Sequence, residues 1–138
     1  MAVSEMAILG LLFAGIGGTA GAFIRFITVE VFKKQTTFPA GVLISNAVGT
    51  FVLALVTFYI SKEAGSLEGE IFRHMELFVF FFNTGVLGSL TTFSALSYDN
   101  LIYLEQKKFL AAAANIFLNI TAGTVAVFAG FLAAFYIL

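Results

Sequence analysis

The chain has 138 residues, of which 60% are hydrophobic and 11% are charged, and its mean hydropathy is +1.02. Soluble domains carry roughly 25% charged residues, so this composition excludes a water-soluble protein and predicts one whose solvent is lipid. The formal net charge of −1 does not indicate a nucleic-acid partner, and the absence of cysteine excludes disulfides and thiolate metal sites. We expect no enzyme, because no nucleophile–base pair or metal-ligand cluster is visible.

Four apolar runs follow one another along the chain. They cover residues 6–31, 39–60, 77–104 and 109–138. A helix that crosses a bilayer needs roughly 20 apolar residues, and each run is long enough. We therefore predict an all-α integral membrane protein with four transmembrane helices, in which residues 1–138 form a single four-helix domain. The middle connection, 61–76, leaves room for a short interfacial turn at most.

The first run carries Arg25 within apolar sequence, and small residues recur along it at four-residue spacing, as at Gly17 and Gly21. Such spacing lets helix backbones approach closely, so packing explains most glycines of this chain. Arg25 has two readings. It lies near the membrane interface, where it snorkels or is paired, or it attracts an anion into a vestibule. The sequence leaves both open.

The second and fourth runs carry amide side chains. Asn46 is central in the second run, while Asn115 and Asn119 lie in the fourth, with Gly123 four residues further on. The i, i+4, i+8 spacing puts the last three on one helix face. Amides on such a face can line a narrow polar path, or they can form a hydrogen-bonded seam between helices. The sequence does not decide between these alternatives.

The third run contains the densest polar stretch, residues 85–97. Two glycines, Gly85 and Gly88, are followed by four hydroxyls within seven residues. A hydroxyl in a helix can bond the carbonyl four residues back. This explanation accounts for one or two of the hydroxyls but is a poor account of four. Non-helical backbone survives in a bilayer only where protein buries it or where it lines a watery path. We therefore predict that the third helix is broken in mid-membrane, and that function resides there.

Two kinds of ion suit such a break. Exposed main-chain carbonyls bind hard cations such as sodium, whereas freed N–H groups and hydroxyls favour an anion. Phe93 lies inside the polar stretch, and the positive edge of its ring can help to coordinate a small anion in a dry constriction.

Four spans put both termini on one side of the membrane. The basic residues are only weakly biased, with four on the far side and two on the terminal side. These are Lys33, Lys34, Lys107 and Lys108 against Lys62 and Arg73. A small protein with so weak a bias can insert in both orientations, and an antiparallel homodimer is the hypothesis that follows.

These features together resemble the Fluc family of fluoride channels, also called CrcB, over essentially the whole chain. The resemblance is carried by residues 17–26, 39–46 and, most specifically, 85–94, GVLGSLTTFS. It implies an antiparallel, dual-topology homodimer with two narrow anion pores in the plasma or inner membrane of a microbe. It also implies passive, fluoride-selective export that confers fluoride resistance, with fluoride, a second copy of the chain and the bilayer as partners.

The resemblance further implies a structural sodium ion at the dimer interface, bound by the main-chain carbonyls of Gly88 and Thr91. Leu96 stands where a second pore phenylalanine is usual, and amides occupy fourth-helix positions where tyrosine and serine are usual. The anion pathway that it implies comprises Arg25, Asn46, Phe93, Ser94, Leu96, Ser97, Asn115 and Asn119.

The alternative is a small dual-topology transporter coupled to protons or to a substrate. Such a pump normally needs a titratable carboxylate deep in a span. The carboxylates of this chain precede a span or lie towards span ends, which favours the channel. Glu5 precedes the first span, Glu30, Asp99 and Glu105 lie towards span ends, and no carboxylate is central in a span.

Overall fold

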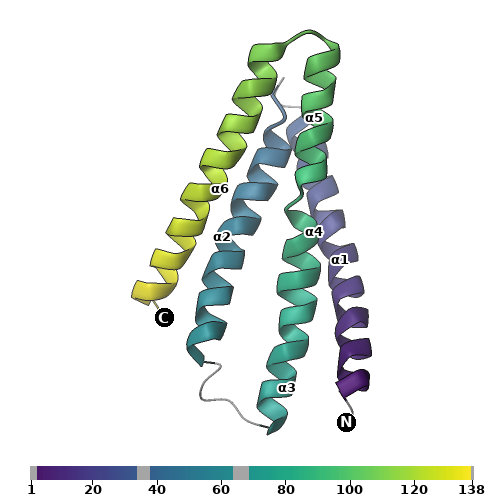
Figure 1. The fold of residues 1–138 in the computed structure, drawn as a ribbon, viewed down its shortest axis with the longest axis vertical. Helices are drawn as coiled ribbons and strands as arrows, with labels where there is room; N and C mark the ends of the chain where they lie inside the picture. The colour runs from purple at the N-terminus through teal and green to yellow at the C-terminus, as the bar shows by residue number, and fades with distance from the viewer. Residues whose placement is uncertain (1–2, 34–37, 64–68, 138) are drawn as a thin grey trace.

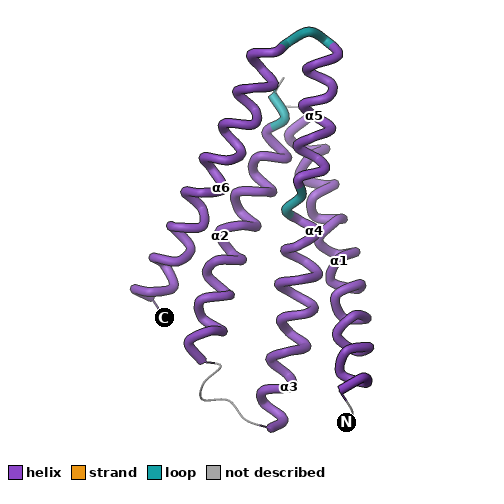
Figure 2. The backbone as a smooth tube through the Cα atoms, viewed as in Figure 1, coloured by secondary structure: helices purple, strands orange, loops and turns teal. Residues whose placement is uncertain are grey.

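The computed structural model describes residues 3–33, 38–63 and 69–137, and every element in these ranges is a helix (Figures 1 and 2). The elements are α1 (Val3–Lys33), α2 (Ala40–Glu63), α3 (Gly69–Phe78), the π-helix η2 (Val79–Leu87), α4 (Gly88–Leu90), α5 (Phe93–Glu105) and α6 (Phe109–Ile137).

Four helical segments are long and apolar enough to cross a membrane, which confirms the four predicted spans. They are Glu5–Lys33, Ala40–Lys62, Arg73–Glu105 and Phe109–Ile137. The third segment is built from α3, η2, α4 and α5. The expectation of at most a short turn in residues 61–76 is wrong, because α3 begins at Gly69. Ile71, Met75 and Phe78 recur at helical spacing there, so the apolar pattern of the third span extends outwards as a helix.

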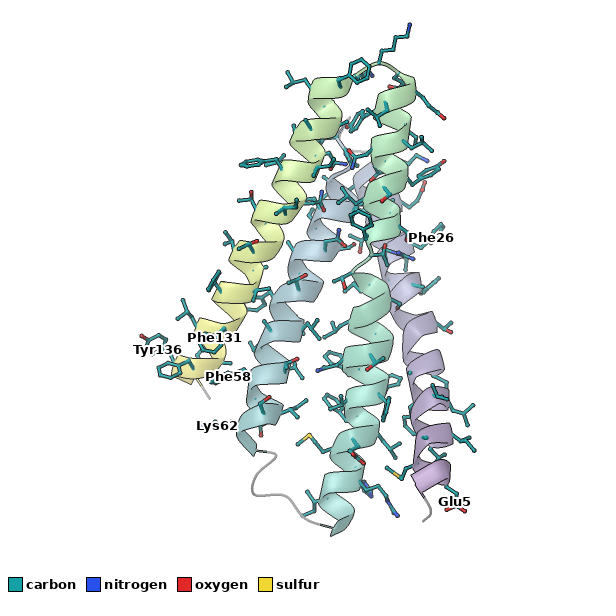
Figure 3. The ribbon with its side chains drawn as sticks, viewed as in Figure 1. Glu5, Phe26, Phe58, Lys62, Phe131 and Tyr136 are labelled. Carbon is teal, nitrogen blue, oxygen red and sulfur yellow. The ribbon has the colours of Figure 1, made fainter. Side chains whose placement is uncertain are left out.

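Both chain termini lie at the same end of the bundle (Figure 1). Lys62 and Glu5 lie at that end too (Figure 3), whereas the connection between α5 and α6, with Lys107 and Lys108, lies at the other. Lys34 falls outside the described residues. Lys62 therefore lies at the end that carries the termini, and Lys107 and Lys108 lie at the opposite end, as four spans predict.

The third span changes its packing partner partway along its length. Its first part, α3, η2 and α4, packs against α1, whereas α5 packs against α6; α2 lies against both α1 and α6. Between the two parts, Thr91 (φ −94°, ψ 112°) and Thr92 (φ −136°, ψ 134°) are extended, and they form the short loop segment between α4 and α5 in Figure 2. The chain is therefore redirected from one neighbour to another at these two threonines.

Glycines bring α1 and η2 into backbone contact. A Cβ atom added at Gly17 would collide with the carbonyl oxygen of Phe81, and one added at Gly85 would lie 2.7 Å from the carbonyl oxygen of Ala14. Gly18, by contrast, has no atom within 4 Å of such a Cβ. The packing face of α1 therefore runs through Gly17, and close approach of the two backbones depends on it.

A second close contact holds α2 against α6. A Cβ at Gly130 would collide with the carbonyl oxygen of Phe51. Nearby, the rings of Phe58 and Phe131 meet edge to face with centroids 4.8 Å apart, at the end of the bundle where both are labelled in Figure 3. This geometry favours aromatic pairs by about 0.5–1.5 kcal/mol beyond burial.

Candidate functional site

Thr92 is the point at which three spans meet. Its backbone N–H donates to Oδ1 of Asn46 on α2 at 3.0 Å. Its hydroxyl accepts a hydrogen bond from Nη1 of Arg25 on α1. The extended segment of the third span is thus tied to both of the preceding spans by polar contacts, and Arg25 is engaged inside the bundle.

The same contacts change the main-chain hydrogen bonding around Gly88. In a continuous α-helix the N–H of Thr92 would donate to the carbonyl of Gly88. Here it donates to Asn46 instead, while the N–H and the hydroxyl of Thr91 both bond to the Leu87 carbonyl at 3.0 and 2.9 Å. The Gly88 carbonyl thereby loses its helical partner, and the Thr91 carbonyl leaves from extended backbone. These two residues fit the main-chain oxygen ligands expected for a hard cation.

A chain of four asparagines runs from Thr92 across the bundle. Nδ2 of Asn46 donates to Oδ1 of Asn119 at 3.1 Å, and Nδ2 of Asn119 donates to Oδ1 of Asn115 at 3.1 Å. Nδ2 of Asn115 donates to Oδ1 of Asn100 at 3.4 Å, and Nδ2 of Asn100 donates to the Leu96 carbonyl at 2.9 Å. We call Asn46, Asn119, Asn115 and Asn100 the asparagine chain. It joins α2, α6 and α5.

Three members of the asparagine chain are buried, with 0% of Asn115, 6% of Asn119 and 7% of Asn100 exposed. Burying an amide without a hydrogen-bond partner costs roughly 1–3 kcal/mol, and the asparagine chain gives each of these three amides a partner for its nitrogen and a partner for its oxygen. These amides are therefore hydrogen-bonded to one another across the helices, and their place on an anion path stays a prediction.

Sequence reasoning missed Asn100. It follows Leu96 by four residues, which places its amide over the carbonyl of that residue, and it lies in the same run as the predicted pathway side chains. An isolated amide in an apolar span needs a partner, and the unpaired stripe on the fourth run could have indicated one.

The predicted pathway residues of α5 are split between two environments. Leu96 is 6% exposed and packs inside the bundle. Phe93 is 80% exposed, and Ser94 and Ser97 are exposed as well. In a single copy of the chain, Phe93, Ser94 and Ser97 are therefore exposed on the surface, whereas Leu96 is part of the core.

A cavity of about 570 Å³ opens where α1 ends, α2 begins and α5 ends. Three cationic side chains line it, those of Arg25, Lys33 and Lys108, against one carboxylate, that of Asp99. A cleft with an excess of positive charge raises the local concentration of anions. Arg25 lines the cavity and also bonds to Thr92, so its side chain links the cavity to the extended segment.

Comparison with known proteins gives a consistent match over nearly the whole chain. The family model described as CrcB-like protein, Camphor Resistance (CrcB), matches residues 12–131. A fluoride-specific ion channel FluC of Methanococcus maripaludis is 32% identical over 126 residues, which cover 91% of this chain and 96% of that protein. The protein of that name from Vibrio vulnificus is 35% identical over 131 residues, covering 94% and 96%. The one from Campylobacter lari is 36% identical over 124 residues, covering 88% and 94%.

The four apolar helices and these similarities together place the protein in the cell membrane as a multi-pass protein.

Proposed function

The chain belongs to the CrcB family, and on that premise we propose that it is a channel through which fluoride leaves a microbial cell passively, so that the cell resists fluoride. The observation that carries this proposal is the similarity, over about nine-tenths of the chain, to proteins named fluoride-specific ion channels. A channel moves its ion without covalent chemistry, so the residues have binding roles and no catalytic ones.

The donor chemistry around Thr92 supports an anion of this kind. Fluoride is strongly hydrated, and a dry passage must replace its water with hydrogen-bond donors. The amide of Asn46, the hydroxyl of Ser94 and the ring edge of Phe93 are uncharged donors. Uncharged donors hold an ion weakly enough that it can leave again, which conduction requires.

The cavity suits the mouth of such a path. Its excess of cationic side chains attracts anions before they lose their water. Arg25 extends from the cavity to the Thr92 hydroxyl, which makes it a guide from the vestibule to the narrow part of the route. In this scheme the ion passes from the cavity to Asn46.

We propose that two copies form an antiparallel dimer with two pores, each copy being one transmembrane domain. The exposed side chains of Phe93, Ser94 and Ser97 support this, because a second copy would cover them and close the path on its open side. Lys107 provides a test of dual topology in this cysteine-free chain. Lys107→Cys should react with membrane-impermeant thiol reagents from both sides of the membrane, and labelling from one side only would contradict dual topology.

We propose sodium as the structural ion at the dimer interface, held by the carbonyls of Gly88 and Thr91. The freed Gly88 carbonyl supports this. Replacing sodium by N-methylglucamine during purification should lower the melting temperature of the dimer, and equal melting temperatures in the two cations would remove sodium from the scheme.

The decisive experiment measures fluoride release from liposomes that contain the purified protein, with chloride release as the control. Fluoride efflux well above that of empty liposomes, with little chloride efflux, is expected. Equal release of both ions, or none, would refute the proposal. Asn46→Asp should abolish fluoride release by putting negative charge on the path. Phe93→Ile should slow it sharply, whereas Leu96→Phe should leave it unchanged or raise it.

The alternative, a transporter coupled to protons or to a substrate, has one observation in its favour. Asp99 has a buried carboxylate oxygen, Oδ2, without a hydrogen-bond partner in the described part of the chain. A coupled transporter would accumulate fluoride against its gradient when a pH gradient is imposed, and Asp99→Asn would abolish this. A channel only dissipates the fluoride gradient, so the same liposomes separate the two.

A further inference from the structure

The asparagine chain has a direction. Every amide in it donates from Nδ2 to the next oxygen, from Asn46 through Asn119 and Asn115 to Asn100. The N–H of Thr92 donates to Oδ1 of Asn46 at one end, and the Leu96 carbonyl accepts from Nδ2 of Asn100 at the other. Both ends of the asparagine chain lie on the third span. The hydrogen bonds run from the extended segment through α2 and α6 and return to the first turn of α5.

The two ends fix that direction. A backbone N–H can only donate, so Asn46 must turn its oxygen towards Thr92 and its nitrogen towards Asn119. A carbonyl can only accept, so Asn100 must turn its nitrogen towards Leu96. Rotating any one amide by half a turn would set oxygen against oxygen on one side and nitrogen against nitrogen on the other. The four amides therefore hold their orientation as a unit, and bonds in such a chain strengthen one another.

The donors left over differ among the four amides. Each amide carries two N–H groups. Asn119 uses both, one towards Oδ1 of Asn115 and one towards the main-chain carbonyl of Asn115 at 3.0 Å. Asn115 and Asn100 each donate once as well, but both are buried. Asn46 is half-buried, and within the described residues only one of its N–H groups is engaged.

We propose that Asn100, Asn115 and Asn119 are positioning residues, which act through the asparagine chain to hold Asn46 with one N–H group directed at the anion. This rests on the proposed channel function and assigns a role to Asn100, which lies outside the predicted pathway. The ion contacts Asn46, and the three buried amides set the angle at which that amide meets it. Asn100 on the third span thereby controls the orientation of the Asn46 amide on the second span, through the other members of the asparagine chain.

The sequence supplies its own control. The protein has five asparagines, four in the asparagine chain and Asn83 outside it. Asn83 donates to Oγ1 of Thr57 at 3.2 Å. Labelling with [15N]asparagine therefore gives five pairs of side-chain N–H signals in an NMR spectrum, one pair for each amide, and one pair belongs to a residue that the proposal leaves unaffected.

The first measurement uses the wild-type protein in nanodiscs and adds sodium fluoride, with sodium chloride as the control. The Asn46 amide signal should show the largest shift, and Asn83 should not move. Shifts of Asn115 and Asn119 as large as that of Asn46 would mean that they contact the ion themselves and would overturn the proposal.

The second measurement uses Asn100→Ala, which removes the end of the chain furthest from Asn46. The signals of Asn115, Asn119 and Asn46 should all change, and fluoride release should fall about tenfold, the effect of one lost hydrogen bond. Asn83→Ala should change neither. A spectral change confined to Asn115, or an unchanged release rate, would overturn the proposal. If Asn100→Ala does not fold, the wild-type titration decides alone.

Failure of the channel proposal gives a different result. Wild-type liposomes would then release no fluoride, while the spectral changes in Asn100→Ala, which depend only on hydrogen bonding, would still report on the asparagine chain.

Discussion

Gly17 offers a sharp test of the packing between the first and third spans. Substitution by alanine places a Cβ atom against the carbonyl oxygen of Phe81 and 3.2 Å from the Cα of Gly85. The neighbouring residue, Gly18, has open space at the same position and lies in the same helix. Gly17→Ala and Gly18→Ala therefore share their chemistry and differ only in what the new methyl group meets.

The expected free energies follow from two terms. Alanine stabilises a helix interior over glycine by about 1 kcal/mol, and both variants gain this. Overpacking costs about 1–3 kcal/mol, and Gly17→Ala stands at the upper end because the obstacle is backbone, which cannot rotate away. We expect Gly18→Ala to raise the free energy of unfolding by about 1 kcal/mol and Gly17→Ala to lower it by about 2 kcal/mol, using these same values.

The assay is reversible unfolding in mixed micelles, followed by circular dichroism as the fraction of denaturing detergent increases. A separation of about 3 kcal/mol between the two variants is the expected outcome, because the helix-propensity gain is common to both and only the overpacking cost differs. Equal stabilities of Gly17→Ala and Gly18→Ala would show that α1 and η2 do not approach as described, and the reasoning would fail.

Three further predictions concern other contacts. Gly130→Ala should destabilise the protein by about 1–2 kcal/mol through its clash with α2, while Gly123→Ala, which meets nothing within 4 Å, should not; the same unfolding assay compares them. Lys107 has a left-handed backbone (φ 57°) after α5, so Lys107→Gly should raise stability by about 1 kcal/mol, and a lowered melting temperature would contradict this. Thr92→Val removes the hydroxyl that accepts from Arg25 and should slow fluoride release, whereas Thr92→Ser should preserve it; equal rates in the two variants would remove this contact from the path.

Much of the fold could be predicted from the sequence, because a bilayer allows few solutions. Each apolar run had to be a helix, since no water is present to satisfy the backbone. The helical start of the third span at Gly69 was missed, because a segment outside the hydrocarbon need not be apolar throughout, and α3 is not. Hydropathy therefore indicates where a span crosses lipid but not where its helix begins.

Within the candidate site, the residue types were visible but their pairings were not. Asn115 and Asn119 share a helix face by spacing alone, and this stripe indicates that a partner is needed, but the sequence does not identify Asn100 as that partner. That pairing depends on α5 meeting α6, which follows from the change of direction at Thr91 and Thr92. A tertiary contact of this kind has no local signature, because the two residues are brought together by the path of the backbone between them.

The change of packing partner along the third span also has a consequence for the order in which the protein is made. When residues 69–90 are synthesised, their neighbour α1 already exists, but when α5 follows, its neighbour α6 does not. Asn100 then lacks its hydrogen-bond partner Asn115, and Asn46 lacks Asn119, until α6 has been synthesised. These amide pairs can form only once α6 has been inserted, so the final step of synthesis both closes the bundle and sets the orientation of its polar groups.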